Sequence, residues 1–171
     1  MATNLFKDDK LAYVYDTALS STRAKASTVD SQLNSYIQSL KAINANFDPN
    51  SKLMSNNGRS YFMAEEDLKA FMSFRWSGEE FGENFKLAKE LDFSEKEKDW
   101  LNTLMQETWY TGFTIAVSKD HPMHLYLVAK SEGEAFTGLS VLLVENANFF
   151  ALFGDNASGQ SLLFHSMRGK V

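Results

Sequence analysis

The residues best suited to chemistry form one short cluster, His121-Pro-Met-His124. Metal-binding histidine pairs usually lie four residues apart on a helix, where both side chains share one face. A three-residue offset on a strand places the two side chains on opposite faces instead. We therefore predict a turn that carries two exposed imidazoles, with no metal site and no cofactor. The third histidine, His165, lies in an apolar segment and is expected to be a hydrogen-bonded residue of a sheet.

Nucleophile motifs are missing from the sequence. The chain has no cysteine, and Gly138-Leu-Ser-Val-Leu142 lacks the second glycine of the Gly-x-Ser-x-Gly elbow that exposes a catalytic serine. Three acids, Glu95, Glu97 and Asp99, lie close together, but carboxylate pairs for acid–base catalysis come from separate elements that face a cleft. We interpret them as the solvated start of a helix, where the helix dipole favours negative charge. The sequence predicts no catalytic residue, and an active site assembled from distant segments stays an alternative.

Composition and charge narrow the class of protein further. The 171 residues are 44% hydrophobic and 23% charged, which is enough apolar material for a packed core. A net charge of −5 argues against nucleic-acid binding, because phosphate contacts need a basic face. Apolar runs such as Val141 to Val144 and Phe149 to Phe153 fall far short of the roughly 20 residues of a membrane span. No signal-peptide stretch opens the sequence, so both a cytoplasmic and an exported location stay open.

The first third of the chain is predicted to be one long helix. Apolar or small residues recur at alternating steps of three and four, without an interrupting glycine or proline, which is a heptad pattern. We call these positions the heptad seam: Ala12, Tyr15, Leu19, Thr22, Ala26, Val29, Leu33, Tyr36, Leu40, Ile43 and Phe47. We expect the seam to pack on the rest of the same chain, with a coiled coil between chains as the alternative. A break between Ser20 and Ser27 is also open, since serine and threonine weaken a helix.

The middle of the chain is predicted to be mostly helical. Asp48-Pro49 ends the long helix, because the residue before proline avoids helical geometry. Asn57-Gly58 favours a hairpin turn, with a plain loop as the alternative. Three shorter helices then follow. The first covers Ala64 to Phe74, and the others begin at the capping boxes Ser77-Gly-Glu-Glu80 and Ser94-Glu-Lys-Glu97.

From Thr111 onward the hydrophobic period changes from about 3.6 to 2, which is typical of strands. Short turns separate five apolar segments, so we predict a five-stranded antiparallel meander over about 111–168. Eight of its residues are expected to form one buried face: Phe113, Ile115, Val117, Leu125, Leu127, Leu139, Val141 and Leu143. With a helical part over about 8–108, the fold class is α+β. The long helix and three shorter helices pack on the meander in a single domain, 1–171.

The third and fourth predicted strands are apolar on both faces, whereas antiparallel sheets often expose one face to water. The helices, another subunit or a ligand must cover the second face. We take as candidate interaction surface Phe149, Phe150, Leu152, Phe153, Leu142, Val144 and Trp76. Between Glu65 and Glu107 there are 12 acidic against six basic residues, which predicts an acidic helical layer suited to a basic protein.

These patterns favour a non-enzymatic protein-binding module of the chaperone, inhibitor, immunity or assembly type. The expected partner is another protein, basic in charge, or a further copy of this chain; no nucleic acid and no membrane span are expected. Two alternatives remain: a carrier of a small apolar ligand in a cavity between sheet and helices, and an enzyme whose site is assembled from distant segments.

Overall fold

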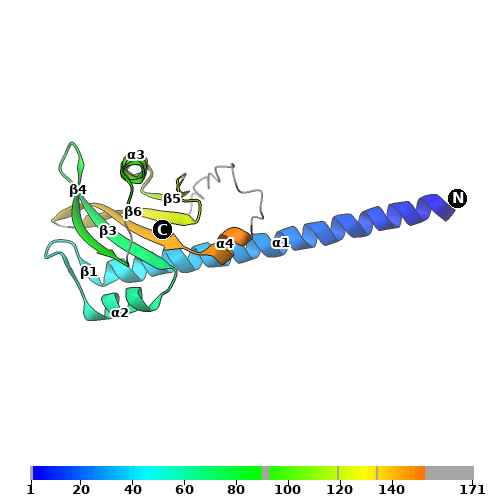
Figure 1. Cartoon of the computed structure of the whole chain (residues 1–171), viewed down its shortest axis with the longest axis horizontal. Coiled ribbons are helices and arrows are strands. Elements are labelled where there is room, and N and C mark those ends of the chain that lie inside the picture. Colours follow the sequence, from blue (N-terminus) through cyan, green and yellow to red (C-terminus); the bar gives the residue numbers. More distant parts are fainter. Residues whose placement is uncertain (1, 90–92, 119, 134, 153–171) are drawn as a thin grey trace. The chain divides into compact units, whose positions relative to one another are not determined.

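The structure is a computed structural model that describes residues 2–89, 93–118, 120–133 and 135–152 (Figure 1). The chain divides into two compact units, Met1–Ser35 and Tyr36–Val171, which we describe one after the other. The helices are α1 (Ala2–Ala45), α2 (Asn56–Ala64), α3 (Glu95–Thr111) and α4 (Ala147–Ala151). The strands are β1 (Phe47–Asp48), β2 (Leu53–Met54), β3 (Leu68–Trp76), β4 (Phe81–Ala88), β5 (Phe113–Val117), β6 (His124–Gly133) and β7 (Phe136–Glu145). Within the described ranges, no helix has the length and apolar character that crossing a membrane requires.

The described residues of the first unit are all helical and form the first part of α1. The helix runs without interruption to Ala45, so the predicted long helix is confirmed and the alternative of a break is wrong. Every side chain from residue 17 to residue 28 is exposed. The hydroxyl of Thr22 donates to the carbonyl oxygen of Ala18 at 2.8 Å, which lets a polar residue sit inside the helix without competing for a backbone donor.

The second unit contains a five-stranded antiparallel sheet in the order β4-β3-β7-β6-β5. A separate two-stranded sheet joins β1 to β2. The α+β class and the five-stranded antiparallel sheet are therefore confirmed. The meander is wrong, because β3, from the middle of the sequence, pairs with β7.

Two of the predicted helices are in fact β3 and β4, which form a hairpin. β3 is almost entirely buried, so its apolar residues form a nearly continuous run that hides the period of two. The box that begins at Ser77 makes the hairpin turn instead of starting a helix. Ser77 N–H donates to the Glu80 carbonyl at 3.0 Å, the Ser77 hydroxyl accepts from Glu80 N–H at 3.2 Å, and Gly78 takes a φ of 104°. A serine with a glutamate three residues later can thus close a turn as well as cap a helix.

The segment around Gly58 is helical rather than a hairpin. Ser55 caps α2, and its hydroxyl accepts from the N–H of Gly58 at 3.1 Å. A Cβ added at Gly58 would lie 2.7 Å from the Cβ of Asn46. Glycine is therefore needed here for a close approach between α2 and the end of α1, and not for a positive φ.

The sheet is also placed differently along the chain from the prediction. Its strands lie between residues 68 and 145, and not between about 111 and 168. The predicted strand at Phe149 is helix α4, because the Asn146 side chain accepts from the N–H of Phe149 at 2.9 Å and starts a turn of helix. The last predicted strand, with His165, lies outside the described residues.

Helix α3 confirms the prediction made from its capping signals. The Ser94 hydroxyl accepts from the N–H of Glu97 at 3.2 Å and begins the helix. Gly112 ends it with a φ of 82° and an N–H that donates to the Thr108 carbonyl at 2.7 Å. Only glycine takes this left-handed conformation without strain.

Both faces of the central strands β3, β7 and β6 are buried within the second unit, and α2 and α3 lie on opposite sides of the sheet (Figure 1). On the α3 side, residues of β3, β6 and β7 share a buried cluster with Leu101, Leu104 and Met105. The segment that follows Ser35, which contains the end of α1 and β1, packs on the other face. Phe47 there meets Phe71 of β3 edge-on, with ring centroids 5.4 Å apart. The helices thus cover the second apolar face of the central strands.

The single buried face predicted for the sheet mixes residues of its two faces. Val141 pairs with Val128, and Leu142 pairs with Leu127. Since paired residues point to the same side, Leu127 and Val141 face opposite sides. Shifting register by one residue exchanges the faces, and the strand sequences alone do not specify the register.

Candidate functional site

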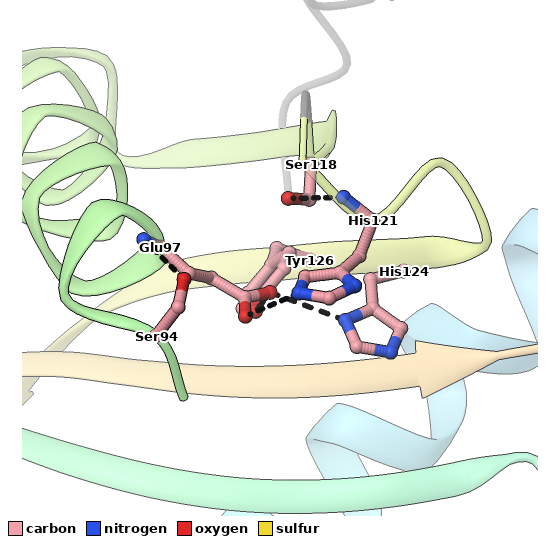
Figure 2. Close-up of polar contacts among 6 residues, drawn as sticks. All are labelled: Ser94, Glu97, Ser118, His121, His124 and Tyr126. Atoms are coloured by element: carbon pink, nitrogen blue, oxygen red, sulfur yellow. Dashed lines mark hydrogen bonds and ion pairs between the residues drawn. The ribbon is translucent and has the colours of Figure 1, made fainter. Parts of the chain in front are cut away.

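A group of polar side chains lies between α3 and β6. Glu97 comes from the first turn of α3, His124 and Tyr126 from β6, and His121 from the turn before β6 (Figure 2). We call these four residues the Glu97 cluster. The side chain of Glu97 is only 1% exposed, and a carboxylate is almost never this buried unless it is paired.

The Glu97 carboxylate has three partners in this cluster (Figure 2). The Tyr126 hydroxyl donates to Oε1, and His124 Nδ1 lies 3.1 Å from the same oxygen. His121 Nε2 lies 3.4 Å from Oε2. The His121 side chain is 46% exposed against 10% for His124, so the cluster meets solvent at His121. The expected exposure is confirmed for His121 and wrong for His124, whose ring stacks on that of His121.

Local sequence explains how each side chain reaches the cluster. The capping bond to Ser94 uses the backbone N–H of Glu97 and leaves its carboxylate to turn toward the sheet. In the turn, the Ser118 hydroxyl accepts from the N–H of His121 at 3.2 Å, and the N–H of His124 donates to the His121 carbonyl at 2.8 Å. These bonds bring the two imidazoles onto the same carboxylate despite their three-residue offset.

Burial and the hydrogen bond to Glu97 both raise the pKa of Tyr126 far above its ordinary value, because each favours the neutral phenol. Tyr126 is therefore a fixed donor to the carboxylate. A carboxylate that orients an imidazole can support a general base. Here the carboxylate is shared among three side chains of the fold, so its bonding capacity is used in joining α3 to β6.

The distances within the Glu97 cluster describe how its polar groups meet. Across the ranges that the structure describes, no group of three or more His, Cys, Asp or Glu residues is arranged to hold a metal ion. The nitrogen–oxygen distances of 3.1 and 3.4 Å are those of hydrogen bonds or ion pairs. The imidazole nitrogens point at the carboxylate oxygens of Glu97 (Figure 2).

A second polar cluster ties the start of the second unit to the sheet. The Tyr36 hydroxyl donates to Asp67 Oδ2 at 2.9 Å, and Asn146 Nδ2 donates to the same oxygen at 2.6 Å and to the Tyr36 hydroxyl at 2.7 Å. Burial, followed by the hydrogen bond to Asp67, raises the pKa of Tyr36. We call these three residues the Tyr36 cluster. It fixes a residue of the heptad seam to Asn146, which lies between β7 and α4, and to the segment before β3.

The candidate interaction surface predicted from sequence is not assembled on one face. Leu142, Val144 and Phe149 are buried among the chain's own residues, and Phe150 and Leu152 are half-buried. Phe153 lies outside the described residues. Trp76 ends β3, whereas Val144 pairs with Leu68 at the start of that strand, so Trp76 is at the far end of the sheet.

Trp76 belongs instead to a cluster of half-buried aromatic rings with Phe81 and Trp109. Its ring centroid lies 4.7 Å from that of Phe81 and 5.3 Å from that of Trp109. The Lys130 Nζ lies 4.4 Å from the centroid of Trp109. The acidic stretch that begins at Glu65 is spread over β3, β4, their turn and α3, and does not form the predicted helical layer.

The carrier alternative requires a cavity between the sheet and the helices that could hold a small apolar ligand. The core residues between sheet and helices are closely buried, including Phe71, Leu127 and Leu142 at 0% exposure. One open depression of about 560 Å³ is lined by residues 45–48 and 53–56, around the β1–β2 pair, and does not lie between sheet and α3. The carrier alternative therefore gains no support from this depression.

The sequence predicts Glu97 to be a solvated residue at the start of a helix, whereas its side chain is buried. A signal was available, since Glu97 precedes Leu101, Leu104 and Met105 at helical spacing and shares their buried face. Its partners were not predictable in this way, because Tyr126 is 29 residues away and reaches Glu97 only through the fold.

Comparison with known proteins adds no relative. No protein-family model matches the chain, no curated protein matches it, and no solved structure matches it.

Proposed function

We propose that this chain is a protein-binding module, and that the exposed stretch of the heptad seam in α1 is its binding surface. One observation carries the proposal: a single seam is buried at one end and exposed at the other. Leu40 is 2% exposed and Leu19 is 49% exposed, although both occupy the same heptad position, a. Thr22 and Ala26 are exposed with Leu19.

The composition of this stretch adds a physical argument. Serine and threonine are frequent between residues 17 and 28, and both are weaker helix formers than alanine or leucine. Most helical stability in proteins comes from packing an apolar face, and not from propensity. A helix with this composition and every side chain exposed lacks such packing. A partner that covers the seam would supply it, as in helix-in-groove and coiled-coil recognition.

The charge of the chain bears on the class of partner. Between residues 17 and 30 the only charged side chains are Arg23, Lys25 and Asp30, which are too few cations for a phosphate-binding face. A second contact for a basic protein is the aromatic cluster of Trp76 and Phe81, since the exposed Glu79 and Glu80 lie in the turn between them. Cationic side chains are attracted to both aromatic faces and carboxylates.

The direct test is site-specific cross-linking in the full chain. A photo-activated cross-linking amino acid replaces Leu19 in one variant and Ala24, on the opposite face of the helix, in a matched control. The proposal predicts covalent adducts with a protein from position 19, in the purified chain or in cells that make it, and few from position 24. Equal yields at the two positions, or none at position 19, would contradict it.

The basic-partner contact has its own test. Reversing charge with Glu79→Lys and Glu80→Lys should slow association with a heterologous partner at low salt, because steering of the encounter depends on long-range charge. An association rate that does not change would remove the turn from the binding surface and leave the seam in place.

A further inference from the structure

We infer that the partner of the exposed seam is a second copy of this chain, aligned parallel and in register as a coiled coil. The inference rests on the proposed function, because it names what binds the same surface. It follows from the heptad positions of the charged residues that flank the seam.

The seam residues set the heptad frame for α1. Leu19, Ala26 and Leu33 take position a, and Thr22 and Val29 take position d. In a parallel pair in register, each a and d residue packs beside its own equivalent, so Leu19 meets Leu19 of the second copy.

The charges beside the seam are complementary under this alignment. Lys25 takes position g and Asp30 takes position e of the next heptad, and both are exposed. Positions g and e of consecutive heptads face each other across a parallel coiled coil and set partner choice and orientation. Lys25 of each copy therefore faces Asp30 of the other, which gives two opposite-charge pairs.

The remaining flanking residues do not oppose this alignment. Arg23, also at position e, faces Ala18 of the second copy, and Gln32 at position g faces Ile37. No like charges meet between residues 17 and 37. When this stretch pairs with a second copy, opposite charges therefore attract at the layer of Lys25 and Asp30, and no charges repel at the other layers. The flanking charges of the chain are thus complementary to those of a second copy.

The test is a charge-reversal cycle on the full chain, with association measured by sedimentation equilibrium. Lys25→Glu alone and Asp30→Lys alone each place like charges opposite one another in a parallel pair. Each should weaken self-association by roughly 2- to 30-fold, as two exposed ion pairs of 0.2–1 kcal/mol each imply. The double variant Lys25→Glu with Asp30→Lys should restore the wild-type association, because it only exchanges the ends of each pair. Circular dichroism of every variant controls for helix content.

The outcomes separate this inference from the proposed function. Loss in both single variants with rescue in the double variant supports the parallel second copy. Association that is insensitive to all three changes overturns the parallel register. If the wild type is monomeric at every concentration while position 19 cross-links to a different protein, the second copy is wrong and the protein-binding proposal stands. A monomer that cross-links to nothing overturns both.

Discussion

The two ends of the heptad seam have the same spacing and opposite environments. From Tyr36 onward the seam is buried in the second unit, and from residue 17 to residue 28 it is exposed. A hydrophobic period therefore identifies the face of a helix that must be covered, but it does not identify what covers it. The expected packing on the same chain is confirmed for the end that begins at Tyr36, and the alternative of pairing between chains stays a proposal for the other.

The side chains themselves differ between the two ends. Within α1 the buried end contributes Tyr36, Leu40 and Ile43, all large, and the predicted seam residue Phe47 follows in β1. The exposed end contributes Leu19 with the small Thr22 and Ala26. Large apolar residues gain more from burial, at about 1.5–3 kcal/mol for each fully buried side chain. The buried end also has a polar anchor in the Tyr36 cluster. The buried end is thus suited to permanent packing, and the contact that we propose for the exposed end is a weaker, reversible one.

The largest expected effect separates the two ends directly. Leu40→Lys should lower the free energy of unfolding by about 3–5 kcal/mol at any protein concentration, because it leaves a cavity and a charge in a packed interior. Gln38→Lys, at a nearby exposed position, is the matched control and should have little effect. Denaturant unfolding followed at two protein concentrations measures both. A loss for Leu40→Lys that disappears at high concentration would place this end between chains as well.

A second change tests whether the α3 side of the sheet is independent of the seam. Glu97→Gln should cost about 1–3 kcal/mol, because an amide has one acceptor oxygen for the three side chains that the carboxylate serves. Glu95→Gln removes an exposed acid from the same helix turn and should cost much less. Self-association should be unchanged in both variants. A weaker association for Glu97→Gln would mean that the two regions are coupled.

A third change should strengthen the exposed end. Ala26→Leu enlarges a seam residue that is exposed, and its burial in a pair of chains should tighten association about tenfold, or ~1.4 kcal/mol. Ala24→Leu adds the same side chain to the opposite face and should leave association unchanged. Analytical gel filtration over a dilution series compares them. Equally strengthened self-association in both variants would indicate non-specific hydrophobic association of the helix, and not a specific contact through the seam.

The smallest effect concerns the polar anchor of the buried end. Tyr36 and Tyr126 have pKa values raised above the ordinary 10.0, so the folded chain holds these protons more tightly than the unfolded chain. Their contribution to stability is complete below pH 10 and is lost as pH rises above it. Tyr36→Phe should cost about 0.5–1.5 kcal/mol at pH 7 and should make the loss above pH 10 less steep. An unchanged alkaline slope, measured by urea unfolding at pH 8 to 11, would contradict this role.

The predictable part of the fold was set by local signals. The heptad period identified α1, and the cap at Ser94 with the following apolar residues identified α3. β3 and β4 were not predictable in this way, because burial on both faces removed the alternation and because the Ser77 turn has the sequence of a capping box. The neighbour relation of β3 and β7 depends on pairing across more than 60 residues, which no local pattern contains.

The candidate sites divide in the same way. The seam was found from sequence because its positions are periodic, and the buried face of α3 could have drawn attention to Glu97. The convergence of His121, His124 and Tyr126 on that carboxylate depends on the turn before β6 and on how α3 packs on the sheet. Both are tertiary features, so the Glu97 cluster emerges only from the fold.

The most direct test of the binding surface is sedimentation of the wild type and of Leu19→Lys across a hundredfold range of concentration, with Ala24→Lys as control. We expect the wild type and the control to pass with concentration from a 19.3 kDa monomer to a species of at least twice that mass. Leu19→Lys should stay monomeric with unchanged thermal stability at the dilute end, because its side chain is exposed within the single chain. A wild type that stays monomeric over the whole range, or a Leu19→Lys variant that associates like the wild type, would contradict the self-associating seam.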